Sequence, residues 1–340
     1  MDQTTASPPQ TAVDVRQMIT GYWAAQMVYV AAKLGVADLL DSGPRAADDL
    51  ARAASVHADS LYRLLRALAS LGIFREQEDG RFAMTKSAEP LRSAGPGSQR
   101  ALALMMGEEH FQCWGELLYC VQTGQSAFEK VFGQPIFPYL SEHPEQGAVF
   151  DAAMVGVHGR ESAAMLDSYD FSDLGTLADV GGGNGSTLAA VLTKHPRLRG
   201  ILFDLPAVVE RARPQLAAAG LTGRCAIVSG DFFASVAGGA DAYLLRHIIH
   251  DWDDARSIQI LTNIRRVIAA TGKLLVVESV IPPGNEPSFG KLLDVNMLVV
   301  PGGRERTEPQ YRDLFRQAGF ELTRIAPTAA EVSVIEGRPL

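Results

Sequence analysis

A cluster of alternating glycines is the first stretch of this 340-residue sequence whose residue types could do chemistry. Gly181, Gly183 and Gly185 follow a short apolar run, and the residues after them have the spacing of a helix. Because glycine has no Cβ atom, these positions offer a bare backbone against which a ligand can lie. No lysine follows Gly185, as a phosphate-binding P-loop would require. The dinucleotide fingerprint GxGxxG also fails, because Ser186 and Leu188 stand where its last small residue would be.

An acidic residue follows each of the next two apolar runs. Asp204 comes 23 residues after Gly181, and Asp231 comes directly before Phe232. Open α/β sheets bind ligands at the carboxyl ends of their strands, where Asp204 could accept hydrogen bonds from both ribose hydroxyls. An acid beside an aromatic ring suits an adenine. Because the set holds carboxylates and glycines but few cations, it favours a nucleoside such as S-adenosylmethionine (SAM) over a polyphosphate.

The elements that position these residues are predicted in the second half of the chain. From about residue 174, short apolar runs alternate with segments of helix length. Such alternation is typical of a parallel β-sheet that is covered by helices on both faces. The last runs, within residues 319–339, are expected to form two closing strands. We therefore predict that residues 169–340 form a doubly wound α/β domain that binds the cofactor.

Residues 12–100 are predicted to form a separate, mostly helical domain. Leucines recur at helical spacing between residues 61 and 71, and Ser55 is a candidate N-cap for this helix. The sequence then alternates around Asp79 and Gly80, which is a hairpin signal. Helices followed by a hairpin are typical of a winged helix.

Charge argues against a nucleic-acid partner for this domain. Residues 1–100 hold 11 Lys and Arg against 11 Asp and Glu, whereas a DNA-recognition element normally carries a basic excess. Residues 18–40 place apolar side chains on several faces of a helix, which is too apolar for a free surface. We therefore expect a structural or dimerising winged helix, and a homodimer that forms through it.

Composition predicts a globular cytoplasmic protein. The chain is 47% hydrophobic and 21% charged, with a net charge of −8. No run of about 20 apolar residues is present to cross a membrane, and no signal peptide is visible. The three cysteines lack the spacing of a zinc site or a disulfide framework, so no metal is expected. A reducing cytoplasm fits best.

Residues 101–168 are predicted to form a helical linker that also lines the substrate pocket. The segment is rich in aromatic residues and methionines, which line pockets for apolar ligands. Together with one residue further along the chain, the candidates are Phe111, Trp114, Met154, His158 and Met297. These side chains suggest a flat apolar molecule, but they do not choose among the classes of aromatic metabolite.

Five short motifs resemble, in order and spacing, those of the plant-type small-molecule O-methyltransferases and their bacterial relatives in antibiotic and phenazine biosynthesis. The motifs are DVGGGNGS, FDLP, GDFF, HIIHDWDD and GGRERT. The resemblance covers nearly the whole chain, because residues 12–100 also resemble the family's winged-helix dimerisation region. It implies a class I methyltransferase fold, which is a Rossmann-like doubly wound sheet of seven strands whose last strand is antiparallel. It also implies a homodimer that uses SAM and releases S-adenosylhomocysteine (SAH).

The resemblance implies cofactor contacts for residues of the first three motifs. Gly181 and Gly183 would lie along the methionine part of SAM, and Asp204 would bind its ribose. Asp231 and Phe232 would hold the adenine.

The resemblance also implies catalytic roles. His250 matches the family's catalytic base, and Glu278 and Glu305 match the two acids that flank it. Arg246 stands where plant enzymes have a cofactor-contacting lysine, and Trp252 matches a tryptophan beside the cofactor.

Methyl transfer from a sulfonium to an oxygen needs alignment and a deprotonated nucleophile. Alignment can contribute roughly 7–11 kcal/mol. A phenol of pKa about 10 beside a histidine of pKa about 6.5 leaves proton transfer uphill by about 3.5 pKa units. Nearby carboxylates favour the imidazolium and so make the histidine more basic. A histidine with two glutamates is therefore a reasonable base for an aromatic hydroxyl.

Three other functions remain open. A relative of this fold could bind SAM yet hydroxylate or decarboxylate a polycyclic metabolite, but such a protein would be expected to lack the base that His250 provides. N-methylation would need a base less strictly. A winged-helix regulator that senses a ligand is disfavoured by the neutral charge balance of the N-terminal domain.

Overall fold

A computed structural model describes residues 14–95 and 97–340, without the side chains of residues 158 and 160. The described chain forms two compact units, which divide between Gly107 and Glu108. The three-part division predicted from the sequence, at residues 100 and 168, remains a prediction.

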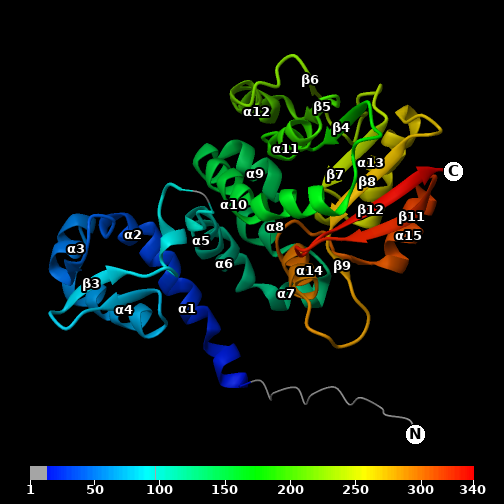
Figure 1. Ribbon diagram of the computed structural model, residues 1–340. Helices are drawn as coiled ribbons and strands as arrows, with labels where there is room; N and C mark the ends of the chain where they lie inside the picture. The colour runs from blue at the N-terminus through cyan, green and yellow to red at the C-terminus, as the bar shows by residue number, and fades with distance from the viewer. Residues whose placement is uncertain (1–13, 96) are drawn as a thin grey trace, which may run out of the picture. The chain divides into compact units, whose positions relative to one another are not determined.

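The first unit combines helices with a small antiparallel sheet (Figure 1). Its elements are α1 (Val15–Lys33), α2 (Val36–Leu39), β1 (Arg45–Ala46), α3 (Ala47–Ala54), α4 (Ala58–Ser70), β2 (Phe74–Glu76), β3 (Arg81–Met84), the 3-10 helix η1 (Glu89–Leu91) and α5 (Arg100–Gly107). The sheet order is β1-β3-β2. The hairpin predicted around Asp79 and Gly80 is confirmed, because β2 and β3 pair antiparallel on either side of these residues.

Helix α4 supplies much of the core of this unit. Leu61, Leu65 and Leu68 lie on one face of the helix, as their spacing predicts, and pack with Phe74 and Phe82 of the hairpin.

The predicted N-cap of α4 is wrong. Ser55 has a φ of 56° and ends α3, and a residue in the left-handed region closes a helix rather than opening one. The side chain of His57 instead accepts the N–H of Ser60 at the start of α4.

The second unit is built on a central sheet (Figure 1). Its first elements are α6 (Glu109–Trp114), α7 (Leu117–Thr123), α8 (Ala127–Phe132), α9 (Ile136–Glu142), α10 (Pro144–Ser168), β4 (Thr176–Val180), α11 (Ser186–Lys194), β5 (Arg199–Asp204), α12 (Pro206–Ala218), β6 (Cys225–Ser229) and β7 (Ala242–Arg246). They continue with the 3-10 helix η2 (Ile249–Asp251), α13 (Asp254–Val267), β8 (Lys273–Glu278), β9 (Val280–Ile281), α14 (Phe289–Val299), β10 (Arg306–Thr307), α15 (Glu308–Gln317), β11 (Phe320–Pro327) and β12 (Ser333–Pro339).

The topology of the main sheet confirms the predicted fold class. Among the described residues, seven strands lie in the order β11-β12-β8-β7-β4-β5-β6. β12 is antiparallel to both of its neighbours, and the other neighbouring pairs are parallel. This is the class I methyltransferase arrangement with one antiparallel strand, and the two strands predicted to close the chain are β11 and β12.

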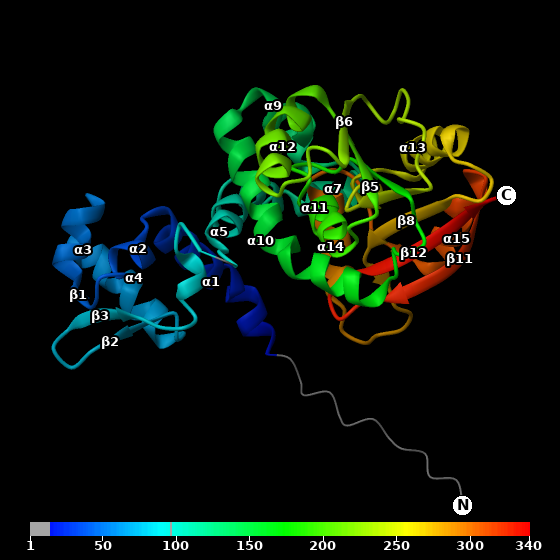
Figure 2. The same cartoon turned by 45° about the horizontal axis from the view of Figure 1, so that its top comes forward.

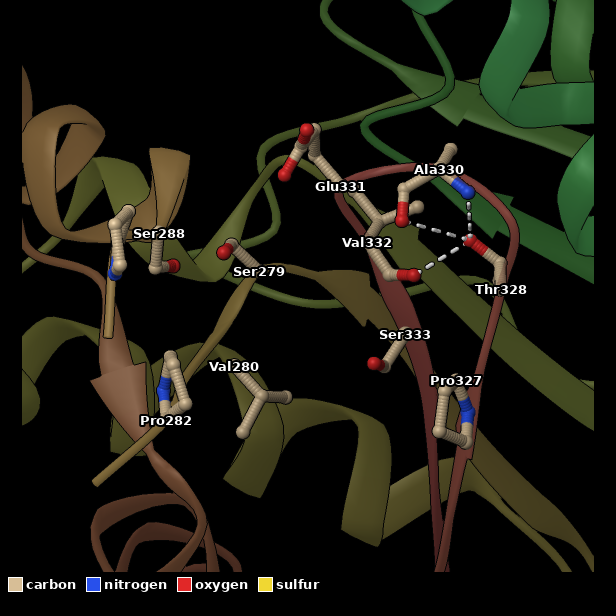
Figure 3. A pocket seen from close by; sticks show the side chains of 11 residues that line it. Ser279, Val280, Pro282, Ser288, Pro327, Thr328, Ala330, Glu331, Val332 and Ser333 are labelled. Carbon is tan, nitrogen blue, oxygen red and sulfur yellow. Dashed lines mark hydrogen bonds between the residues drawn. The ribbon is translucent and has the colours of Figure 1, made fainter. Parts of the chain in front are cut away.

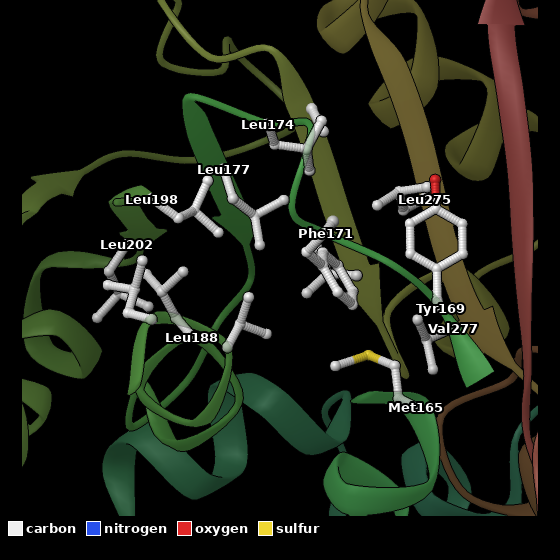
Figure 4. Packing of buried hydrophobic residues seen from close by; sticks show 14 of the residues in the cluster. Met165, Tyr169, Phe171, Leu174, Leu177, Leu188, Leu198, Leu202, Leu275 and Val277 are labelled. Atoms are coloured by element: carbon white, nitrogen blue, oxygen red, sulfur yellow. The ribbon is translucent and has the colours of Figure 1, made fainter. Parts of the chain in front are cut away.

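Helices lie on both faces of this sheet (Figure 2), and apolar side chains pack between them and the strands. In β7, Leu244 packs on one face with residues of α10, α11 and α12, whereas Leu245 packs on the other with residues of α13 and α15. Successive residues of a strand point to opposite faces, so a fully apolar strand must be buried on both sides. Figure 4 shows the first of these clusters, with Met165 of α10 and Leu188 of α11 over the strands.

Because the inner strands are parallel, the residues at their carboxyl ends meet at one edge of the sheet. β4 ends at Val180, β5 at Asp204, β7 at Arg246 and β8 at Glu278. The predicted cofactor and catalytic residues therefore gather at the edge where open α/β sheets bind ligands.

Within the described ranges, no helix combines the length and the apolar character that crossing a membrane requires. In the same part of the chain, no group of three or more His, Cys, Asp or Glu side chains could hold a metal ion.

Candidate active site

The glycine loop after β4 is locked to the end of β5. Gly181, Gly183 and Gly185 have φ values of 72°, 58° and 77°, a region that favours glycine. The N–H of Gly183 donates to Asp204 Oδ2 at 2.8 Å, and the N–H of Leu205 donates to Asp204 Oδ1 at 2.7 Å. One carboxylate thus fixes both the loop and the start of the following segment.

The loop is open to a ligand at Gly183. A Cβ atom at Gly183 would meet no atom within 4 Å, whereas one at Gly181 would lie 2.5 Å from Ile248 Cδ1. Burial raises the pKa of Asp204, and the N–H groups of Gly183 and Leu205 lower it in part. Because each carboxylate oxygen has a second lone pair, Asp204 can still accept hydrogen bonds from a ligand.

Aromatic rings line the neighbouring strand ends. Phe232 packs edge-to-face on Phe233 with ring centroids 4.9 Å apart, and Phe233 packs edge-to-face on Trp252 at 4.8 Å. Phe137 lies 5.7 Å from the Trp252 ring. Asp231 is exposed, and its Oδ1 accepts the N–H of Phe233 at 2.8 Å. This cluster places an apolar wall and a carboxylate beside the glycine loop.

Arg246 joins the end of β7 to α10 and α11. Its guanidinium donates to Ser162 Oγ at 2.9 Å, to Thr187 Oγ1 at 2.6 Å and to Glu161 Oε2 at 2.8 Å. The same Glu161 oxygen lies 2.8 Å from His247 Nε2. Whether Arg246 also contacts the cofactor remains a prediction.

His250 lies on η2, the turn that follows β7. Its Nδ1 is 2.6 Å from Glu305 Oε1, and its Nε2 is 3.6 Å from Asp251 Oδ1. His250 and Glu305 are both buried, with 7% and 1% of their surface exposed. An ionised carboxylate can only accept, so Nδ1 carries the hydrogen and Nε2 is the nitrogen that can take a proton from a substrate.

The carboxylates around His250 make it basic. Burial on its own lowers the pKa of the imidazole, but Glu305 and Asp251 outweigh burial and raise the pKa from 6.5 to about 10. Burial raises the pKa of Asp251 to about 7, against the attraction of His250. The raised pKa favours the imidazolium form of His250 at neutral pH.

Glu278 holds the backbone of this turn rather than the imidazole. Its Oε1 accepts the N–H groups of Ile248, Ile249 and His250 at 3.1, 2.6 and 3.1 Å. Its Oε2 accepts the hydroxyl of Tyr311 at 2.7 Å. Of the two acids expected to flank His250, only Glu305 hydrogen-bonds its ring in the structure.

The GGRERT segment crosses the same turn. The N–H of Arg304 donates to the His250 carbonyl at 2.8 Å, and the N–H of Glu305 donates to Asp294 Oδ1 at 2.9 Å. A Cβ atom at Gly303 would collide with the His250 carbonyl and the Asp251 backbone. Glycine at this position therefore lets Glu305 approach the imidazole.

The predicted acceptor residues lie on three helices. Phe111 and Trp114 of α6 are 40% and 39% exposed, and Trp114 Nε1 donates to Asn296 Oδ1 of α14 at 3.0 Å. Met154 is half-buried on α10, and Met297 is buried on α14. The side chain of His158 lies outside the described part of the chain. Their common role as a pocket lining remains a prediction.

The structure also has a cavity of about 260 Å³ away from these residues (Figure 3). It lies between the segment that follows β8 and the β11–β12 connection, and its lining includes Ser279, Pro282, Thr328 and Glu331. It contains none of the predicted site residues, and its small polar side chains do not suit a flat aromatic ligand.

Sequence reasoning missed two groups at the turn that carries His250. Asp251 follows His250 directly in the HDW motif, and Arg306 follows Glu305 directly in GGRERT. Arg306 is 1% exposed and hydrogen-bonds the carbonyls of Ile249 and Trp252. Their position next to His250 and Glu305 in the sequence could have pointed to them, but a sequence motif does not show which side-chain and backbone atoms are in contact.

Known proteins resemble this chain over nearly its full length. Residues 114–321 match the O-methyltransferase domain family, and residues 16–92 match the O-methyltransferase dimerisation domain. A phenazine O-methyltransferase of Lysobacter antibioticus is 49% identical over 95% of each chain. An 8-amino-8-demethylriboflavin N,N-dimethyltransferase of Streptomyces davaonensis is 38% identical over 98% of this chain and 97% of its own. A solved methyltransferase of calicheamicin biosynthesis, in its SAH-bound form, superposes with a TM-score of 0.81 at 37% identity, covering 96% of this chain and 97% of its own.

We expect Gly303→Ala to destabilise the protein. The added methyl group would press on the backbone of η2, which cannot rotate away as a side chain can, so the free energy of unfolding should fall by about 1–3 kcal/mol. Gly223→Ala is the control, because a Cβ atom there would meet nothing within 4 Å. Urea unfolding of both variants measures the difference. Equal stability of the two would show that the close approach at Gly303 is not a constraint.

Proposed function

Because the chain belongs to the O-methyltransferase family and is a SAM-dependent methyltransferase, we propose that it methylates a hydroxyl of an aromatic small molecule, with His250 as general base. The observation that carries this proposal is the buried contact between His250 Nδ1 and Glu305 Oε1, at the sheet edge that also bears the glycine loop. Since a close relative is a phenazine O-methyltransferase, the acceptor we favour is a flat, multi-ring phenol.

The residues at the sheet edge fit SAM. The open face of Gly183 leaves room for the methionine part, and Asp204 has lone pairs for the ribose hydroxyls. Phe232 and Asp231 would hold the adenine, with Trp252 behind them. When bound, SAM supplies a methyl group on a sulfonium, which leaves as a neutral thioether.

Arg246 would serve the cofactor indirectly as well as directly. Its hydrogen bonds to Thr187 and Ser162 hold the first turn of α11, which follows the glycine loop, against α10. Its positive charge at this edge suits the carboxylate of the methionine part.

His250 Nε2 would take the proton of the acceptor hydroxyl as the oxygen forms its bond to the methyl carbon. With the pKa of His250 raised to about 10, proton transfer from a phenol of pKa about 10 to the neutral imidazole is no longer uphill. The reactive pair is imidazolium and phenolate. This pair can form in two ways. The neutral imidazole can remove the proton of a bound phenol, or the imidazolium can bind an acceptor that is already a phenolate. The two starting complexes contain the same number of protons, so both lead to the same reactive pair.

N-methylation is the second candidate function. A relative that is 38% identical over most of both chains is an N,N-dimethyltransferase. An amine acceptor has a lone pair before it loses a proton, so the base would matter less. Hydroxylation or decarboxylation is disfavoured by the intact pair of His250 and Glu305, and a regulator by the match to the methyltransferase domain.

A homodimer would form through the first unit. The dimerisation domain covers residues 16–92. Helix α1 exposes large apolar side chains, with Met18, Ile19 and Trp23 at 69%, 68% and 57%. A monomer rarely leaves such a contiguous apolar surface in water. The described cysteines are all free and buried, as expected for the cytoplasm, in which we place the enzyme.

SAM and SAH should stabilise the protein against heat, and NAD and ATP should not. A ligand present at 100 times its Kd stabilises by about 2.7 kcal/mol. Asp204→Ala should remove most of this effect, because it deletes both the ribose acceptor and the anchor of Gly183. Differential scanning fluorimetry with the four ligands is the measurement. Stabilisation by NAD but not by SAM would refute the assignment of the glycine loop.

His250→Ala should lower turnover by about 10²–10⁴-fold, the usual contribution of a positioned base. SAM affinity should remain, because other strands hold the cofactor. The loss should shrink at high pH, where the phenol ionises without help. Initial rates against pH, at saturating SAM, give the result. Full activity of the variant at neutral pH would remove His250 from the mechanism and favour N-methylation.

Glu305→Gln is the matched comparison for this test. Only the neutral imidazole accepts a proton, so the wild-type kcat/KM should rise with pH up to the raised pKa of His250. In Glu305→Gln that pKa is lower, so the rise should move to lower pH while the imidazole still functions. A profile identical to wild type would show that Glu305 does not set the basicity of His250.

Light scattering should give a mass near twice 36.5 kDa. Trp23→Glu should yield monomers, because a charge in an apolar interface is costly. Leu71→Glu is the control, since Leu71 is also exposed, at 54%, but lies at the end of α4. A wild-type monomer at micromolar concentration would contradict the proposed dimer.

A further inference from the structure

The turn that carries His250 is held on its carbonyl side by one buried cation. Arg306 donates to the carbonyl of Ile249 at 3.1 Å and to that of Trp252 at 2.9 Å. Its Nε and Nη2 also bond Asp254 Oδ1 at 3.0 and 2.8 Å, and Nη2 lies 3.2 Å from Ser257 Oγ. The two carbonyls lie on either side of His250, so Arg306 spans the turn.

The amide side of the same turn is held by a carboxylate. Glu278 accepts the N–H groups of Ile248, Ile249 and His250. The backbone of η2 is thus bound by an anion through its donors and by a cation through its acceptors. Charge-assisted hydrogen bonds of this kind are stronger than neutral ones, so the turn has little freedom to move.

The short β9–β10 pair connects Glu278 and Arg306 to Glu305, the hydrogen-bond partner of the imidazole. β9 pairs parallel with β10, with Val280 opposite Arg306. Glu278 lies two residues before Val280, and Glu305 directly precedes Arg306. A shift of β10 would therefore move the Glu305 carboxylate and the Arg306 guanidinium together.

A gain in folding stability is a weak explanation for the burial of the Arg306 guanidinium. A fully buried guanidinium loses its hydration, and buried ion pairs often add little net stability. The planar guanidinium instead fixes the relative positions of its partners, because it hydrogen-bonds two carbonyls and a carboxylate at once. A lysine ammonium cannot do this with the same geometry.

We propose that Arg306 is a positioning residue for methyl transfer. It holds the backbone of η2 in the position that brings His250 Nδ1 within hydrogen-bond distance of Glu305 Oε1. The inference rests on the proposed role of His250 as base. Arg306 would touch neither the acceptor nor the cofactor, and it would act through the backbone of η2.

The charge-conserving variant Arg306→Lys tests this inference. Losing the positive charge would itself raise the pKa of His250, so a lysine isolates the geometry. The other charged or titratable groups that face His250 are Glu305, Asp251, Glu278 and His247, and they stay unchanged.

In Arg306→Lys, a crystal structure should show the His250–Glu305 contact opened from 2.6 Å to beyond hydrogen-bond distance. Turnover should fall by about 10- to 100-fold, as expected for a misplacement of about 1 Å. The rise of kcat/KM with pH should move to lower pH, because the imidazole loses its carboxylate. SAM affinity should change little.

Arg224→Lys is the matched control. Arg224 also donates to backbone carbonyls, that of Leu192 in the last turns of α11 and those of His195, Pro196 and Leu198 in the segment before β5, at the opposite edge of the sheet. This variant should lose thermal stability and keep the wild-type pH profile.

An unchanged contact and pH profile in Arg306→Lys, with only a lower melting temperature, would overturn the inference and leave Arg306 a structural residue. If Arg306→Lys does not fold, Asp254→Asn carries the test, because it weakens two of the hydrogen bonds of Arg306. Because the loss of a negative charge would itself lower the pKa of His250, the readout for this variant is the His250–Glu305 contact in a crystal structure, which should lengthen from 2.6 Å. An unchanged contact would count against the inference. Failure of the proposed function would appear separately, as full activity of His250→Ala.

Discussion

The hydrogen bond of 2.6 Å between His250 and Glu305 is the interaction on which the proposed catalytic site depends. The two residues are 55 positions apart in the chain, and both side chains are nearly excluded from solvent. Bringing them together requires a glycine at 303, where any side chain would meet the backbone of η2. It also requires α14 to place Asp294 against the N–H of Glu305.

The free-energy cost of burying the His250–Glu305 pair accounts for the presence of Glu278 and Arg306 beside it. An imidazolium and a carboxylate lose their hydration when they are buried, and their mutual attraction offsets that loss only with good geometry. Glu278 and Arg306 supply the geometry by binding the turn from its two sides, with the hydroxyl of Tyr311 on the second oxygen of Glu278. Glu305 therefore faces the imidazole and Arg306 faces Asp254, whereas the charge of Glu278 is met by backbone N–H groups and a hydroxyl.

Much of the fold could be predicted because it follows from local patterns. The alternation of apolar runs and helix-length segments after residue 174 gave the parallel sheet, and the glycines at 181, 183 and 185 gave the loop. The antiparallel position of β12 came from the family resemblance rather than from periodicity. The predicted cap at Ser55 failed because propensity does not show that the preceding helix ends there in a left-handed residue.

The site was harder to predict because its contacts join distant segments. A motif indicates that Glu278 and His250 belong together, but not that the carboxylate binds three backbone N–H groups instead of the ring. The partners of Arg246 lie 59 to 85 positions away. Nothing in the local sequence distinguishes Arg306, which is buried, from Arg304 two residues earlier, whose side chain is 46% exposed.

The effect of Glu305 on His250 can be measured directly as the protonation state of His250 in the wild-type, ligand-free protein. The ¹⁵N chemical shifts of its imidazole can be followed against pH by NMR, with His250→Ala to assign the signals. Both ring nitrogens should be protonated at neutral pH, and the group should titrate well above 6.5, because Glu305 and Asp251 favour the imidazolium. A His250 that is neutral at pH 7, or that titrates at or below 6.5, would contradict this expectation.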